Sequence, residues 1–309
     1  MIAIIEEKCK GVFAMDYLLL AIATLSASGK ALFCKIIGTE KGRTIFLANF
    51  QAFAVATLVS LLFLLSELSG IGSISLFTLG LSFVFAGSLF FTQIMQMKAM
   101  SEGPASLTTL IYSSAFLIPI VFGAVAWQEP IRTMQYLGIA IMLVALFLIV
   151  WQKDSRAVHK RWLLFVFLSA LGSGANAILQ KVHQFSEFRH ELKYFLLFAL
   201  FFSSLFSLLG YLFWKKEPVK QRPLPIGPCK AKLHALAPIP LGISVAFLNF
   251  LNLILAGRLP SVIQFPIYNI GSLLLTSAIS VLAFHERLST RKLVGFFVGM
   301  IAIILVGMF

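Results

Sequence analysis

Long apolar segments alternate with short polar ones from one end of the chain to the other. A helix that crosses the hydrocarbon core of a bilayer needs roughly 20 apolar residues, and the apolar segments have this length. They lie at about 16–37, 44–66, 74–98, 104–127, 133–151, 162–182, 192–214, 234–256, 260–284 and 292–309. The pattern therefore predicts an all-α membrane protein with ten transmembrane helices.

The composition supports lipid as the solvent of this chain. Of its 309 residues, 59% are hydrophobic and only 12% are charged. Soluble globular domains are about half apolar and about a quarter charged. Ten spans leave only short loops, so no separate soluble domain is expected, and we expect an integral, multi-pass protein of the plasma (inner) membrane whose surroundings are the lipid bilayer.

We interpret the net charge of +13 as a feature of a membrane protein and not as a sign of nucleic-acid binding. The basic residues lie in short loops, where they set topology and contact anionic headgroups. They concentrate after the first, fifth, seventh and ninth apolar segments. The positive-inside rule would place those loops in the cytoplasm and both termini outside.

Landmarks in the first half recur in the second half in the same order. Three pairs are separated by 156 positions: Pro104 with Pro260, Ile111 with Ile267, and Tyr112 with Tyr268. Two pairs are separated by 157 positions: Glu129 with Glu286, and Gly138 with Gly295. In the earlier helices the separation is 146 positions, for Ser28 with Gly174, Ala31 with Ala177, and Lys35 with Lys181. The alternative is chance similarity between generic apolar helices.

Five helices in each half imply that the second half enters the membrane from the opposite side. Such inverted-topology repeats are typical of many secondary transporters. We therefore predict two inverted five-helix repeats, residues 1–151 and residues 152–309.

The sequence contains no group of residues suited to catalysis. All twelve acidic residues fall in loops or at the ends of apolar segments. No His and acidic residues share metal-ligand spacing, no Gly-rich loop suits a phosphate, and no nucleophile has a nearby base. The three cysteines are far apart, which argues against a disulfide framework and a zinc site. We expect no enzyme, no cofactor and no metal.

Lys30 is the most informative polar residue inside an apolar segment. It follows Ser26, Ser28 and Gly29, whose small side chains permit close helix packing. A charge at this depth is costly in lipid and should face the protein interior, where it would pair with an anionic substrate group or titrate. The alternative is snorkelling over about seven residues, roughly 10 Å. Its predicted repeat counterpart is Asn176.

Carboxamides recur on two other helices. Gln93 and Gln96 are three residues apart and so share a helix face, as do Asn249 and Asn252. Carboxamides donate and accept hydrogen bonds to polar solutes. We predict that they line a central cavity; the alternative is that they join neighbouring helices.

Two tyrosines lie about eight residues inside their apolar segments. Tyr112 is one, and Tyr268, followed by Asn269, is the other. A tyrosine offers an apolar ring and a hydroxyl group, so we predict that all three line the same cavity; the alternative is an interfacial belt. Pro119 and Pro266 lie in the same helices and permit bends.

Four charged residues at predicted helix ends are interpreted as solvated anchors or caps. They are Lys35, Glu129, Lys181 and Glu286.

Each half ends in a helix, a short Glu-bearing turn and a Gly-bearing helix. The turns are WQEP at 127–130 and FHERLS at 284–289, and the most specific stretch is HERLSTRKLVGFFVGMIAIILVG at 285–307. This arrangement resembles the drug/metabolite transporter superfamily, in its EamA-domain type of permease and exporter. The first half departs from that family, with QEPIR where an ER pair is usual.

The resemblance implies a ten-helix fold with a cavity between the first, third, fourth, sixth, eighth and ninth helices and alternating access by rocking of the two halves. It also implies cytoplasmic termini, against the charge bias, so sidedness stays open. The expected function is that of a secondary-active transporter of a small polar or amphipathic metabolite, with export as the expected direction. The alternatives are a drug or amine exporter and a non-transporting membrane scaffold or sensor. A small molecule is the expected partner, and a homodimer is left open.

Overall fold

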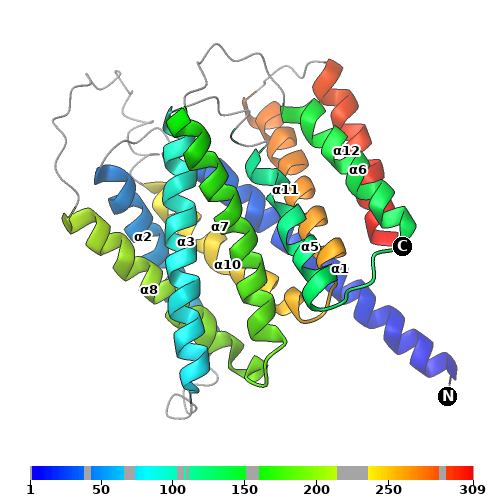
Figure 1. Cartoon of the computed structure of the whole chain (residues 1–309), viewed down its shortest axis with the longest axis horizontal. Coiled ribbons are helices and arrows are strands. Elements are labelled where there is room, and N and C mark those ends of the chain that lie inside the picture. Colours follow the sequence, from blue (N-terminus) through cyan, green and yellow to red (C-terminus); the bar gives the residue numbers. More distant parts are fainter. Residues whose placement is uncertain are drawn as a thin grey trace.

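The structure is a computed structural model that describes residues 2–37, 43–65, 74–102, 108, 111–150, 160–213, 236–284 and 290–308. All regular elements in these ranges are helices (Figure 1). In chain order they are α1 (Ile2–Ile37), α2 (Arg43–Leu64), α3 (Leu76–Glu102), η2 (Ser114–Phe116), α5 (Leu117–Ala126), α6 (Thr133–Val150), α7 (Lys160–Gln184), η3 (Arg189–Glu191), α8 (Leu192–Phe213), α10 (Pro238–Ala256), α11 (Ser261–Phe284) and α12 (Thr290–Met308).

The apolar segments form these helices as the sequence pattern predicts. Within the described residues, six helices are long and apolar enough to cross a membrane, and four further apolar helices are shorter. The all-helical membrane architecture is therefore confirmed. Helix α1 begins at Ile2, well before the predicted start at 16.

The two prolines affect their helices differently. Pro119 follows the 3₁₀ turn η2 at the start of α5; it has no N–H to bond Ala115, and its ring would crowd that carbonyl in a continuous α-helix. Pro266 lies inside α11, which continues past it. In the predicted fourth helix, the proline is thus accommodated by a change from a 3₁₀ turn, η2, to an α-helix, α5.

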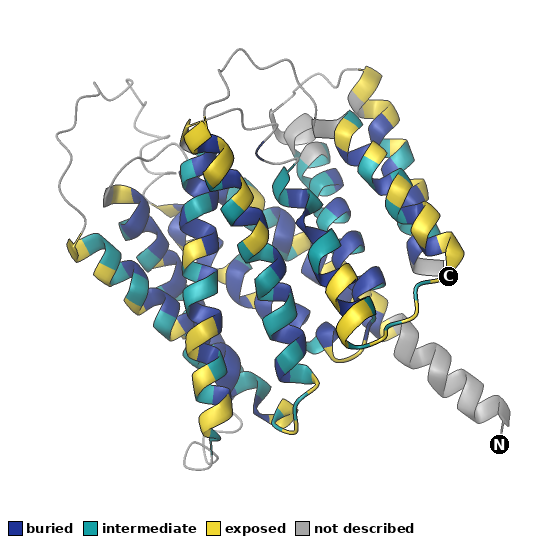
Figure 2. Ribbon diagram, in the orientation of Figure 1, coloured by how far each residue is buried: buried dark blue, intermediate teal, exposed yellow. Residues whose placement is uncertain are grey.

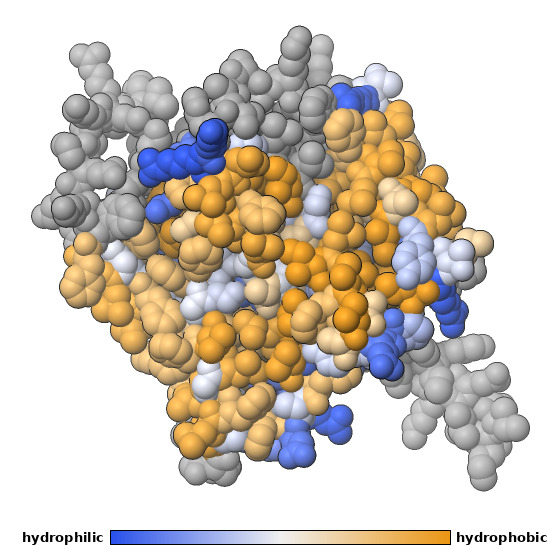
Figure 3. All heavy atoms as spheres, in the orientation of Figure 1, coloured by the Kyte–Doolittle hydropathy of each residue, from blue (hydrophilic) through white to orange (hydrophobic). Residues whose placement is uncertain are grey.

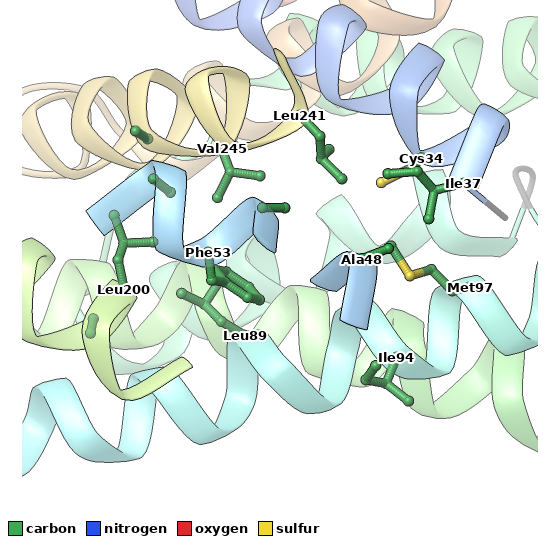
Figure 4. Packing of buried hydrophobic residues seen from close by; sticks show 14 of the residues in the cluster. Cys34, Ile37, Ala48, Phe53, Leu89, Ile94, Met97, Leu200, Leu241 and Val245 are labelled. Atoms are coloured by element: carbon green, nitrogen blue, oxygen red, sulfur yellow. The ribbon is translucent and has the colours of Figure 1, made fainter. Parts of the chain in front are cut away.

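Six helices share one set of hydrophobic clusters and form the larger bundle: α1, α2, α3, α7, α8 and α10. Its main cluster joins the end of α1 to α2, α3, α8 and α10 through residues such as Cys34, Phe53, Leu89, Leu200 and Leu241 (Figure 4). Two smaller clusters attach α1 to α10 and α7 to α3.

The remaining helices form the smaller bundle: residues 111–126 (with η2 and α5), α6, α11 and α12. Phe116, Met142, Phe265 and Val306 belong to its cluster. Figure 1 shows this bundle beside the larger one. Each bundle contains helices from both predicted repeats, so the hydrophobic clusters do not follow the division at residue 151.

Extensive packing joins particular pairs of helices. Helix α2 packs against α8, and α6 packs against α12. Helix α3 packs against α7 and α8, while α10 packs against α1 and α2. The two bundles meet where α1 contacts α11 and where α7 contacts η2 and α5.

The outside of the molecule is apolar around its middle. Figure 3 shows a broad hydrophobic belt with hydrophilic side chains near its two ends, and Figure 2 shows exposed residues along the outer helix faces. Leu58, Phe83 and Val125 are among the large apolar side chains exposed there. Such a surface suits contact with lipid tails, since in water it would be costly.

Candidate functional site

The nine predicted site residues lie on both bundles. Six belong to the larger bundle, namely Lys30, Gln93, Gln96, Asn176, Asn249 and Asn252; three belong to the smaller bundle, namely Tyr112, Tyr268 and Asn269. Three of the helices that carry them make contacts between the bundles: α1 contacts α11, and α7 contacts η2 and α5.

Lys30 faces the protein and not the lipid. Residues three, four and seven positions away share its helix face, and there Ala23, Ala27, Cys34 and Ile37 are all buried. Lys30 itself is only half-buried. Within the described part of the chain, the structure gives its ammonium no hydrogen bond or ion pair. Lys30 thus lies on the inward face of α1 with part of its surface accessible.

Small residues bring α1 close to α10 next to Lys30. A Cβ atom added to Gly29 would lie 2.7 Å from the Ser244 hydroxyl oxygen. On the other side, the Ser28 hydroxyl donates 3.2 Å to the Ser272 carbonyl of the smaller bundle. The small residues around Lys30 thus permit close packing, as the sequence predicted.

Asn176 also combines an interior direction with partial exposure. Ser169, Gln180 and His183 share its face of α7 and are buried, whereas Asn176 is half-buried. Its amide donates to the Thr92 hydroxyl at 3.3 Å. Among the described residues its side-chain oxygen has no hydrogen-bond partner, so only the amide nitrogen is bonded there.

Gln93 and Gln96 are more deeply buried than the sequence suggested. Their side chains are 3% and 7% exposed. The Gln93 Nε2 and Gln96 Oε1 atoms have no hydrogen-bond partner in the described residues. Buried polar groups without partners are uncommon, and no partner for these two amide atoms occurs among the described residues.

Asn249 and Asn252 each contact a glutamine that sequence reasoning did not single out. Gln180 donates to the Asn249 side-chain oxygen at 3.1 Å, and Gln264 donates to the Asn252 carbonyl at 2.9 Å. The Asn252 side-chain oxygen has no partner. Gln180 and Gln264 are themselves polar residues inside apolar segments, which was the signal available for finding them.

The two tyrosines approach each other across the predicted repeats. Tyr268 interacts electrostatically with Tyr112 and with its neighbour Asn269. All three are half-buried. The Asn269 amide also donates to the Phe265 carbonyl at 2.9 Å. The structure therefore brings Tyr112, Tyr268 and Asn269 together on the smaller bundle.

The interpretation of Lys181 as a solvated anchor is wrong. Its side chain is 1% exposed and forms an ion pair with Glu129, which is 12% exposed. The turn after α5 folds back onto the end of α7 and excludes water from the pair. Glu286 and the side chain of Lys35, their predicted counterparts, lie outside the described residues.

No cluster of three or more His, Cys, Asp or Glu side chains suited to a metal ion occurs among the residues that the structure describes.

Residues 14–151 match the model of the EamA-like transporter family. No curated protein sequence matches the chain. One solved structure, titled only as the crystal structure of a protein, aligns with a TM-score of 0.73 at 16% sequence identity, over 94% of this chain and 96% of the other. At that identity the likeness concerns the fold alone.

Proposed function

Residues 14–151 belong to the EamA-like transporter family, and from this premise we propose that the chain is a secondary-active transporter that moves a small polar or amphipathic metabolite by alternating access. The proposed substrate site lies between the larger and the smaller bundle. Export across the plasma membrane is the proposed direction.

Lys30 carries this proposal. It is a cation that faces the protein interior, is half-exposed, and has no ion pair within the described residues. A structural lysine at this depth would be expected to pair with an acid, because an unpaired charge inside a membrane protein is costly. A solute that supplies a negative group would remove that cost when it binds.

The surrounding groups favour a solute with an anionic group and several hydrogen-bonding atoms. None of the nine proposed site residues is acidic. Asn176, Gln93, Gln96 and Asn252 each have a side-chain atom without a partner, and the two tyrosines add hydroxyl groups and apolar rings. A zwitterionic or anionic metabolite with an apolar part fits this chemistry better than an organic cation, which Lys30 would repel.

The packing pattern supports two inverted repeats, residues 1–151 and residues 152–309. The repeat pairs α1 with α7, α2 with α8, α3 with α10, 111–126 with α11, and α6 with α12. If each helix is replaced by its repeat counterpart, the α3–α7 contact becomes α10–α1, the α3–α8 contact becomes α10–α2, and the α7–α5 contact becomes α1–α11. All of these contacts occur in the structure. The α2–α8 and α6–α12 contacts are unchanged by the exchange. A pseudo-two-fold of this kind suits alternating access.

The bodies proposed to move are the two bundles and not the two halves of the sequence. Each hydrophobic cluster contains helices from both halves, so rocking the halves would break both clusters. Rocking the smaller bundle against the larger one keeps the main cluster of the larger bundle together and separates only Ala177 of α7 from the cluster of the smaller bundle. We propose that this motion opens the contacts that separate the proposed site from either membrane face.

A flux assay in proteoliposomes tests the proposal. Lys30→Met is compared with Lys30→Arg, which keeps the charge, and with Lys160→Met, a matched loss of an exposed lysine at the beginning of α7. We expect Lys30→Met to reduce flux of anionic and zwitterionic solutes at least tenfold and the other two variants to retain most of it.

Other outcomes would support the alternatives. Selective flux of organic cations, increased by Lys30→Met, would indicate a drug or amine exporter. No flux of any solute by either the wild type or the variants, with no thermal stabilisation by any metabolite, would indicate a scaffold or sensor and would overturn the proposal.

A further inference from the structure

Glu129 is placed by an unusual turn at the end of α5. Gln128 has a positive φ of 52°, which reverses the chain so that the Glu129 N–H donates to the Gly123 carbonyl at 3.2 Å. Gly123 must lack a side chain here, because a Cβ atom would lie 2.6 Å from a Glu129 carboxylate oxygen and 2.8 Å from the Ser261 hydroxyl. The turn thus fixes the carboxylate against the beginning of α11.

Within the smaller bundle, Glu129 is held by the first turn of α11. The Ser261 N–H donates to Glu129 Oε2 at 2.7 Å. The first N–H groups of a helix have no partner inside the helix and favour an anion. Both Glu129 and Ser261 belong to the smaller bundle, so this contact persists if the bundle moves as one body.

The other carboxylate oxygen of Glu129 reaches across to the larger bundle. Lys181 of α7 donates to Oε1, and its ammonium lies 5.7 Å from the Trp127 ring centroid and 5.6 Å from that of Phe185. The two rings stack on each other, 5.4 Å apart. Lys181 is therefore enclosed by an acid and an aromatic pair, and the ion pair is a buried charged contact between the two bundles.

We propose that the Lys181–Glu129 ion pair is a gate latch that holds this end of the proposed pathway closed, with Glu129 remaining on the N-terminus of α11 when the pair separates. The proposal rests on the alternating access proposed above. It goes beyond the substrate site, because neither residue belongs to that site, and it assigns a role to one end of the bundle.

The position of the latch at one end follows from chain direction. Lys181 lies near the end of α7 and Arg161 near its beginning, so the two mark opposite ends of the helix. Arg161 forms a second ion pair, with Glu102, but that pair is largely exposed. The buried pair joins the two bundles, whereas the exposed pair joins α7 to α3 inside the larger bundle. The Arg161–Glu102 pair therefore provides a matched control.

Thiol accessibility tests the latch directly. Ser272→Cys places a near-isosteric, half-buried thiol on α11, in a background in which Cys9, Cys34 and Cys229 are replaced. Labelling by a membrane-impermeant maleimide is measured from each side, in right-side-out and inside-out vesicles. We expect Glu129→Gln and Lys181→Met each to raise the labelling rate from the latch end roughly tenfold, and the double variant to raise it no further than either single variant.

The controls separate gating from general loosening. Glu102→Gln should leave labelling from both sides unchanged. Labelling from the end opposite the latch should fall in Glu129→Gln, because alternating access opens one end at the expense of the other. Monodisperse elution and unchanged labelling of a lipid-facing thiol at Leu58→Cys verify that the variants are folded.

Two results would overturn the latch. One is unchanged latch-end labelling in folded Glu129→Gln and Lys181→Met, and the other is an equal rise from both ends. The flux experiment is independent: absence of flux for every solute counts against the proposed transport function, whereas the maleimide result alone decides whether the ion pair controls access. A short thiol cross-linker between Glu129→Cys and Lys181→Cys should, in addition, keep latch-end labelling at its lowest value.

Discussion

Gln180 of α7 donates a hydrogen bond of 3.1 Å to Asn249 of α10, inside the larger bundle. The Asn249 amide in turn donates to the Val245 carbonyl of its own helix at 2.8 Å. Both side chains are buried. This bond is a direct polar contact between two helices of the same predicted repeat, residues 152–309.

Replacing either partner should cost more than replacing both. Gln180→Leu leaves the Asn249 oxygen without a partner, and Asn249→Leu leaves the Gln180 amide without one. A bond of this kind in a membrane protein contributes about 0.6 kcal/mol on average, whereas an unsatisfied buried group costs about 1–3 kcal/mol. We expect each single variant to lower stability by about 1 kcal/mol or more, measured by thermal unfolding in detergent.

The double variant Gln180→Leu/Asn249→Leu serves as the control for this prediction. It removes both polar groups and leaves neither partner unpaired. We therefore expect the double variant to lose less stability than the two single variants lose together. Strict additivity would show that the two side chains do not depend on each other.

The sequence predicts the helices well because lipid imposes a simple rule on composition. Any segment that crosses the bilayer must be apolar and must satisfy its own backbone hydrogen bonds, and both conditions can be read locally. The interior direction of Lys30 follows from the same rule, since its charge could not face lipid. The sequence aligns Tyr112 with Tyr268 as counterparts in the predicted repeats, whereas their mutual electrostatic interaction comes from the structure.

The burial of Lys181 could not be predicted in this way. A lysine near a helix end has the same local pattern whether water or a folded-back turn covers it. Its environment depends on Gln128 adopting a positive φ and on Gly123 leaving room for Glu129. The division into two bundles is likewise a property of long-range packing, because neither cluster is contiguous in sequence.

Gln93→Leu should separate stability from transport. The Gln93 Nε2 atom is buried without a partner, and replacing such a group by an apolar one of similar size is often neutral or stabilising. We expect unchanged or higher thermal stability, together with a transport rate about tenfold lower, which corresponds to the loss of about 1.4 kcal/mol of interaction with the solute. Unfolding and proteoliposome flux are measured on the same preparation.

The matched variant for Gln93 is Gln180→Leu, whose amide already has a partner in the protein. It should lose stability. A large stability loss in Gln93→Leu, similar to that of Gln180→Leu, would mean that Gln93 serves packing and not the solute.

Gly242→Ala should weaken the contact between α10 and α2. A Cβ atom at this position would collide with the Ala52 carbonyl and would lie 2.7 Å from Val55 Cβ. Because the carbonyl belongs to the backbone, it cannot rotate away, and overpacking of this kind costs about 1–3 kcal/mol. We expect a lower unfolding temperature.

Gly80→Ala is the control for Gly242, since among the described residues no atom beyond its chain neighbours and its own helix backbone lies within 4 Å of a Cβ added there. Alanine is favoured over glycine inside a helix by roughly 1 kcal/mol, so stability should rise slightly. Equal effects of the two substitutions would contradict the close approach of α10 to the α2 backbone.

The effect of a substitution at Gln128 should depend on whether the new residue tolerates a positive φ, and not on the loss of the glutamine side chain. Among the non-glycine residues of the described ranges, Gln128 is the one with a positive φ, which is 52°. Gln128 is exposed. A left-handed conformation costs an L-residue about 1–2 kcal/mol, and a β-branched residue more. We expect Gln128→Gly to preserve stability and latch-end thiol labelling, and Gln128→Val to lower stability and raise that labelling. If Gln128→Val behaved like Gln128→Gly in both measurements, the turn would not be what holds Glu129 against Ser261 and Lys181.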